Sequence, residues 1–205
     1  MLQTLFSNPI LFIVWAIGLI LAISVHEYAH ARAADQLGDP TPRSQGRLTL
    51  DPRAHLDPLG TLALLFLGFG WGKPVSFDPY NLRNPRRDSG IIAIAGPISN
   101  ILFATILSLA IRFIDLPTII DTVFSILISM NIMLAVFNLV PIFPLDGEKI
   151  LGSILPDDLY REYSSIMTQY GTIILILMLL PIAGGRSPIS ALISPIISFF
   201  TRLLL

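Results

Sequence analysis

Two histidines and a glutamate lie within the five residues H-E-Y-A-H at positions 26–30. Residues four apart share one face of an α-helix, so the imidazoles of His26 and His30 are expected to project together, one turn apart. That arrangement suits two nitrogens that converge on one metal ion. Glu27, beside the first histidine, can take a proton from a water molecule that the metal activates and pass it on. The spacing therefore predicts a hydrolytic metal site with Glu27 as its general base.

A plainer interpretation of the same residues is structural. Two helical histidines could form interhelical hydrogen bonds, and Glu27 could pair with Arg32. However, these residues end a run that is almost purely apolar from about residue 9 to residue 34. An ionisable residue inside a membrane costs about 3 kcal/mol or more and marks a functional site by default. Three of them within five positions favour the metal site.

Two histidines leave a zinc site incomplete, because a catalytic zinc takes three protein ligands and keeps one position open. The chain has no cysteine, so the third ligand must be His, Asp or Glu. His55, in D-P-R-A-H-L-D-P-L-G, is the only other histidine. The better candidate is Asp146, in N-L-V-P-I-F-P-L-D-G, because Pro141 and Pro144 can turn the chain back towards the histidines. An aspartate before a glycine is also typical of a turn, so the spacing alone leaves both interpretations of Asp146 open.

The composition indicates a polytopic membrane protein. The chain has 205 residues, of which 53% are hydrophobic and 13% charged, and its mean hydropathy is +0.73. A soluble domain of this size carries about a quarter charged residues. The net charge of −1 gives no sign of a nucleic-acid partner. We therefore expect an all-α membrane protein in the lipid bilayer; a transmembrane protein or peptide as its substrate is what the resemblance described below implies.

Five apolar blocks are candidate transmembrane helices, since about 20 helical residues cross about 30 Å of hydrocarbon. They are residues 9–34, 91–114, 117–140, 163–183 and 187–205, the last being shorter and interrupted by Pro188 and Pro195. We expect one membrane-embedded domain over residues 1–205, with a core at roughly 9–152 and C-terminal spans within 163–205.

A shorter apolar run, L-G-T-L-A-L-L-F-L-G-F-G-W at 59–71, lies between the first two spans. Its glycines disfavour a helix, whereas its β-branched and aromatic residues favour a strand. Non-helical backbone at membrane depth is tolerated where protein or a watery cavity surrounds it. Residues 59–77 are therefore expected to form a re-entrant, β-hairpin-like element.

The basic residues predict the orientation in the membrane. No Lys or Arg precedes Arg32, and the segment 32–87 holds eight of the thirteen. The positive-inside rule places this segment in the cytoplasm. With five spans, the N-terminus is then outside, the C-terminus inside, and the histidines lie near the cytoplasmic side of a cell membrane.

Taken together, these motifs resemble the site-2 protease family of intramembrane zinc metalloproteases, peptidase family M50, in its compact form without a PDZ domain. H-E-Y-A-H (26–30) is similar to the zinc-binding helix of that family, and N-x-x-P-x-x-P-L-D-G (138–147) to its second signature. G-P-I-S-N (96–100) and G-W-G-K-P-V (70–75) also resemble family sequence, and the likeness covers roughly residues 18–152. It implies one zinc ion bound by His26, His30 and Asp146.

The resemblance further implies peptide-bond hydrolysis in or near transmembrane segments, that is, regulated intramembrane proteolysis. In that family resemblance, Asn100 and Asn138 would line the cleft and hold the substrate backbone or the oxyanion. From the sequence alone, the simpler interpretation of each Asn is a hydrogen bond between helices. His55 lies in an H-x-D-P-x-G setting common in the compact branch and is a third candidate. The missing PDZ module leaves the selection of substrates open.

Two functions without proteolysis are alternatives. In a transporter, the buried His and Glu side chains would form a cation or proton pathway, although no inverted repeat is visible. In a metal-binding adaptor, the site would serve only to bind membrane proteins, but such a protein has no need of Glu27. Zinc uptake by vesicles without cleavage would favour the transporter.

Overall fold

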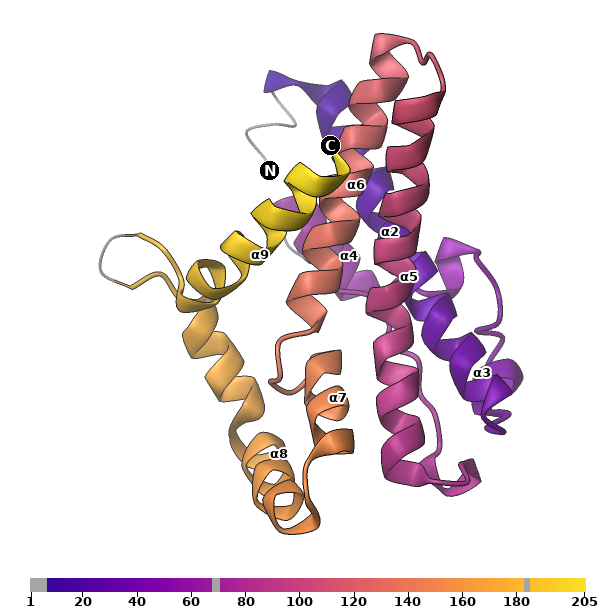
Figure 1. Ribbon diagram of the computed structural model, residues 1–205, viewed down its shortest axis with the longest axis vertical. Coiled ribbons are helices and arrows are strands. Elements are labelled where there is room, and N and C mark those ends of the chain that lie inside the picture. Colours follow the sequence, from indigo (N-terminus) through magenta and orange to yellow (C-terminus); the bar gives the residue numbers. More distant parts are fainter. Residues whose placement is uncertain (1–6, 68–70, 183–184) are drawn as a thin grey trace.

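The computed structural model describes residues 7–67, 71–182 and 185–205 (Figure 1). Within this described part the chain is helical, and the β structure there is a single isolated bridge. Three helices are long and apolar enough to cross a membrane: α2 (Pro9–Gln36), α5 (Pro85–Phe113) and α6 (Thr118–Asn138). The prediction of an all-α membrane protein is therefore confirmed.

Local sequence signals explain where the first two of these helices begin. The side chain of Asn8 accepts a hydrogen bond from the backbone N–H of Leu11, and Pro9 occupies the first turn of α2. Proline suits this place because the first backbone N–H groups of a helix have no partner within it. Pro85 occupies the same place in α5.

The three long helices pack closely around small and apolar side chains. Gly18 of α2 faces Leu127 and Met130 of α6, and a Cβ at position 18 would lie 2.8 Å from each side chain. Helices α2 and α5 run antiparallel, since Ala22 contacts Asn100 and His30 contacts Ile92. This register brings the histidine turn of α2 against the middle of α5.

The short helix α7 (Asp146–Ile154) follows α6 and packs against α5. Helix α8 (Asp157–Leu179) begins beside α7, and α9 (Pro188–Leu204) crosses α6 (Figure 1). At the end of α9, the carbonyls of Leu203 and Leu204 accept hydrogen bonds from Arg112 and Ser108 of α5. Together, α8 and α9 therefore traverse the bundle once.

This path corrects the prediction of five separate spans. Four charged residues occupy the first turns of α8, which leaves a helical apolar stretch of about 17 residues before Pro181; these residues are Asp157, Asp158, Arg161 and Glu162. Helix α9 is also 17 residues long. A helix of that length spans about 25 Å, less than the hydrocarbon thickness.

The prediction that the end of the chain lies on the side of the histidines is likewise wrong, because α9 ends beside Arg112.

The predicted β-hairpin over residues 59–77 is also wrong where the structure describes it. Residues Pro58–Leu67 form α4, while residues 68–70 lie outside the described part. Asp57 caps this helix, since its side chain accepts from the N–H of Gly60 at 2.8 Å. The run is rich in leucine, which favours a helix, and Thr61 is its β-branched residue. The bridge between Leu56 and Gly72 is all that remains of the hairpin in the described residues.

Three shorter helices lie in the segment between α2 and α5, namely α3 (Thr41–Ser44), η1 (Pro52–Ala54) and η2 (Pro79–Asn81). Asp39 connects two parts of this segment. Its buried carboxylate accepts hydrogen bonds from Thr41, from the N–H of Asp78 and from the amide of Asn81. The segment is thereby folded back onto the end of α2.

Candidate metal centre

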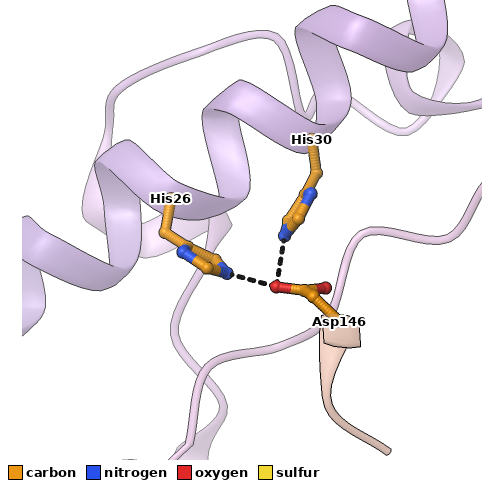
Figure 2. A group of neighbouring side chains, drawn as sticks. All are labelled: His26, His30 and Asp146. Carbon is orange, nitrogen blue, oxygen red and sulfur yellow. Dashed lines mark hydrogen bonds and ion pairs between the residues drawn. The ribbon is translucent and has the colours of Figure 1, made fainter. Parts of the chain in front are cut away.

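Two histidines of α2 and the first residue of α7 point at one another, as Figure 2 shows. Asp146 Oδ2 lies 3.0 Å from His26 Nε2 and 3.3 Å from His30 Nε2. One ligand atom from each of the three residues lies within 4.8 Å of the others. Both histidines are buried and Asp146 is largely so. The structure thus brings together the three residues that the sequence suggests as metal ligands.

The other nitrogen of each imidazole is engaged behind the site. His30 Nδ1 lies 2.7 Å from the carbonyl oxygen of Ile92, which can only accept, so Nδ1 carries the hydrogen. His26 Nδ1 lies 2.6 Å from Asn100 Oδ1. The Asn100 amide is oriented by its Nδ2, which donates to the carbonyl of Ala22, so its oxygen faces His26 and accepts. Both Nε2 atoms are therefore left with a lone pair towards Asp146.

A buried amide pair extends this support to α6. Asn100 Nδ2 also donates to Asn131 Oδ1 at 2.8 Å, and Asn131 Nδ2 donates to the carbonyl of Leu127. Neither Asn side chain is exposed. Sequence reasoning did not single out Asn131, although an amide in the middle of the apolar run 117–140, which also holds Asn138, was a signal that could have found it.

Gly96 of α5 forms the wall facing both imidazoles. A Cβ at position 96 would lie 2.5 Å from His30 Nε2 and 2.6 Å from His26 Nε2. Any larger residue would therefore occupy the space next to the two nitrogens. The glycine leaves room for an ion between the imidazoles and the carboxylate, so the residues present fit a metal with N and O ligands.

Asp146 reaches the histidines because of the loop before it and the helix after it. Gly147 packs against the carbonyls of Leu139 and Val140, where a Cβ would clash with the backbone. The hydroxyl of Tyr163 on α8 donates to the carbonyl of Pro141 at 2.9 Å. Asp146 is the first residue of α7, and the start of a helix favours a negative charge there.

Glu27 lies on the same turn of α2 and contacts a segment without regular secondary structure. Its Oε2 accepts a hydrogen bond from the backbone N–H of Val75 at 2.9 Å. Gly72 permits this approach, because a Cβ there would lie 2.6 Å from Ile23 and 3.1 Å from the carbonyl oxygen of His55. Glu27 is half-buried.

The two remaining candidates lie apart from this group. Asn138 is half-buried at the end of α6, and its Nδ2 donates to the carbonyl of Leu134 within its own helix. His55 is fully buried, with Nε2 2.7 Å from the carbonyl oxygen of Thr49. Within the described residues, neither forms a hydrogen bond with the three clustered side chains.

Comparisons with known proteins agree with the family resemblance of the sequence motifs. A family model described as peptidase family M50 matches residues 114–179, which hold α6, α7 and α8. YwhC of Bacillus subtilis is 36% identical over 178 residues, covering 82% of this chain and 81% of YwhC. Rip2 of Mycobacterium tuberculosis is 29% identical over 182 residues, covering 85% of this chain and 70% of Rip2.

A third relative, MJ0392 of Methanocaldococcus jannaschii, is 25% identical over 178 residues, covering 86% of this chain and 45% of MJ0392. The names of all three proteins contain the words zinc metalloprotease. No solved structure shows a significant match.

Proposed function

The chain belongs to peptidase family M50 and is a zinc metallopeptidase, and from that premise we propose that it hydrolyses peptide bonds in or near transmembrane segments of other proteins. Regulated intramembrane proteolysis is the physiological setting that we propose for this reaction. One observation carries the proposal: the three buried donor side chains meet inside a bundle of membrane-length helices. A substrate that reaches them must itself enter the membrane.

We assign the zinc ligands to Nε2 of His26, Nε2 of His30 and a carboxylate oxygen of Asp146. The support is the free lone pair on each Nε2, the converging carboxylate and the open space above Gly96. When bound, zinc lowers the pKa of water towards 7 and polarises the scissile carbonyl. The chain itself supplies the orientation, because Asn100 and Ile92 fix both rings by their Nδ1 atoms.

Glu27 is proposed as the general base that takes the proton of the attacking water and delivers it to the leaving amine. The N–H of Val75 holds Oε2, which leaves Oε1 for the proton. For Asn100 we propose a different role from the one the resemblance implies, namely to orient the ring of His26, and its full burial behind that ring supports this role. Asn138, which is partly exposed, remains the candidate for contact with the oxyanion.

The segment 73–76, which is neither helix nor strand, offers a place for the substrate backbone. A transmembrane helix hides its carbonyls in internal hydrogen bonds, so the scissile stretch must unwind before it is cut. We propose that the unwound stretch lies along this segment in the manner of an added strand. The segment contacts Glu27 through Val75, and three of its four residues are exposed, namely Lys73, Pro74 and Ser76.

The proposed location is a cell membrane, with the site near the cytoplasmic side and the start of α2 outside. Ten of the thirteen basic residues lie either in the segment 32–87 or near α7 and the start of α8, at the histidine end of the bundle. The positive-inside rule places that end in the cytoplasm. We also propose that residues 1–205 act as one domain, since α9 packs against α6 of the core.

The test uses purified protein and a helical membrane substrate. Glu27→Gln is expected to keep zinc and to abolish cleavage, whereas Asp146→Ala is expected to lose zinc. A Glu27→Gln protein that cleaves at the wild-type rate contradicts the role of Glu27, and unchanged zinc content in Asp146→Ala removes it from the ligands. Zinc transport by proteoliposomes without any cleavage contradicts the proposed function as a whole.

A further inference from the structure

Arg47 is a buried cation in the segment between α2 and α5. Its side chain donates hydrogen bonds to the backbone carbonyls of Ala54, Lys73 and Pro74, the last two at 3.2 and 2.9 Å. The residue is 4% exposed and forms no ion pair with the described part of the chain. Removing a charge from water is costly unless its hydrogen bonds are well satisfied. The three carbonyls provide these hydrogen bonds, and two of them belong to residues 73 and 74.

One peptide group connects Arg47 to the proposed general base. The carbonyl of Pro74 accepts from Arg47 Nη2, and the N–H of Val75, in the same peptide group, donates to Glu27 Oε2. A peptide group is planar, and in the usual trans form its C=O and N–H point in opposite directions. Arg47 and Glu27 therefore bind the two ends of a single dipole.

We propose that Arg47 is a positioning residue for catalysis, which acts on Glu27 through the peptide group between residues 74 and 75. The cation fixes the plane of that group and polarises it, so the N–H of Val75 is both better placed and a stronger donor. One carboxylate oxygen of Glu27 is thereby held in place, and the other is kept in the orientation needed to accept a proton. Arg47 does not touch the reacting atoms.

The neighbouring contacts support this arrangement, because they bind the same segment to the loop that holds His55. The N–H of Lys73 donates to the carbonyl of His55 at 2.8 Å. The ring of His55 in turn binds Thr49, which closes the turn between residues 49 and 55. Arg47 thus connects two loops that are also joined by the hydrogen bond between Lys73 and His55. Residues 73 and 74 are therefore bound by Arg47 and by His55 together.

The inference rests on the proposed role of Glu27, and the experiment separates the two. Arg47→Met keeps much of the apolar stem of the side chain and removes its donors. In the full-length protein, with a helical membrane substrate, we expect kcat to fall about 10- to 100-fold, a fraction of what a positioned base contributes. Zinc content is expected to stay within about twofold of the wild type, since zinc binding does not use Glu27, so a loss of kcat at constant zinc content reports on the base.

Arg53→Met is the matched control. Arg53 lies in the same loop region and pairs with Asp51, but it is exposed and has no bond to residues 73–75. It is expected to leave kcat unchanged.

A double-mutant cycle identifies the route. In Glu27→Asp the shorter carboxylate no longer reaches the N–H of Val75, so adding Arg47→Met to it is expected to cause no further loss of kcat. Independent, multiplicative losses in the double variant overturn the inference. If Glu27→Gln alone keeps wild-type activity, the proposed function of Glu27 fails, whatever Arg47 does.

Val75→Pro provides a second probe, because it deletes the one N–H that binds Glu27 and leaves the bonds of Arg47 in place. It is expected to lower kcat as Arg47→Met does, with zinc retained. The inference is overturned if either Arg47→Met or Val75→Pro keeps full kcat, or if both lose zinc together with activity, which would make the contact structural.

Discussion

Asn100 of α5 accepts a hydrogen bond from His26 of α2, with 2.6 Å between Oδ1 and Nδ1. The same amide donates to Asn131 of α6, so three helices meet behind one imidazole. The amide fixes which nitrogen of His26 carries the hydrogen and which faces Asp146. Outer contacts of this kind orient metal-binding histidines and raise their basicity.

Replacing Asn100 with alanine is therefore expected to weaken zinc binding about 10- to 100-fold. The buried Nδ1–H of His26 loses its acceptor, and the ring is free to rotate away from Asp146. Competition with a chelator of known affinity measures the change. Asn138→Ala is the control, because Asn138 binds within its own helix and is expected to keep wild-type zinc affinity. Equal affinity in the two variants would show that the amide does not orient His26.

Gly96→Ala is expected to abolish zinc binding while the helices remain folded. The added methyl group would lie 2.5 to 2.6 Å from the two Nε2 atoms, so one or both rings must move. Metal analysis together with circular dichroism separates loss of zinc from loss of fold. Ile98→Ala on the same helix, at an exposed position, is the control. A zinc-loaded Gly96→Ala protein would mean that the ion lies away from this wall.

Arg86 of α5 anchors α7 at the end opposite Asp146. It donates to the carbonyls of Gly152 and Leu155, and its guanidinium lies 4.2 Å from the centre of the Tyr160 ring. Its ion pair with Asp157 is exposed on the aspartate side and contributes at most about 1 kcal/mol. The carbonyl bonds are thus the main contribution.

Arg86→Met is expected to lower the unfolding free energy by about 2 kcal/mol and to weaken zinc binding several-fold, because Asp146 begins the helix that Arg86 holds. Thermal unfolding in detergent, with and without zinc, measures both effects. Arg87→Met, at the exposed neighbouring position, is expected to change neither. If zinc stabilises Arg86→Met as much as it does the wild type, α7 does not depend on this anchor.

Asp39 makes a pH-dependent contribution to stability. Burial acts to raise the pKa of its carboxyl, but hydrogen bonds from Thr41, Asn81 and Asp78 outweigh burial and lower it. A group whose pKa is lower in the folded state stabilises the fold above its unfolded pKa of about 4, and this stabilisation is lost as the pH falls. The apparent melting temperature of the wild type is therefore expected to decrease below about pH 4.

Asp39→Asn is expected to cost about 1–3 kcal/mol at pH 7, since an NH2 group replaces one accepting oxygen, and to flatten this decrease. Melting curves between pH 7 and pH 3 provide the measurement. Asp115→Asn, at an exposed position, serves for comparison. The same acid slope in Asp39→Asn and the wild type would assign the pH dependence to other groups.

The zinc-site motif was the most predictable part of the molecule, because chemistry restricts its residues. Burying ionisable side chains four residues apart is costly unless they bind something. Asp146 follows Pro141 and Pro144, which end the helix and allow the chain to turn back towards the histidines. Asn131 was missed because nothing in the local sequence marks it as different from Asn138 in the same apolar helix. Its importance comes from Asn100, which is 31 residues away in the sequence and adjacent in space.

The errors of topology arose where length and composition were ambiguous. The glycines near residues 59–72 suggested a strand, but Gly60 lies in the first turn of α4, where Asp57 caps the helix. The apolar block at 163–183 was long enough to cross as a helix, but the chain stops being helical at Leu179, before Pro181. Tertiary contacts between α9 and α5 then decide the path, and these contacts have no signal in local sequence.

The course of α8 and α9 determines on which side of the membrane a tag fused after α9 would be detected. Helix α9 finishes beside Arg112, and the antiparallel register of α2 and α5 places Pro9 at that same end of the bundle (Figure 1). We therefore expect a tag after Leu205 to be exposed in the same compartment as one placed before α2. Five independent crossings would separate the two tags by the bilayer, so protease accessibility in sealed vesicles tells the two arrangements apart.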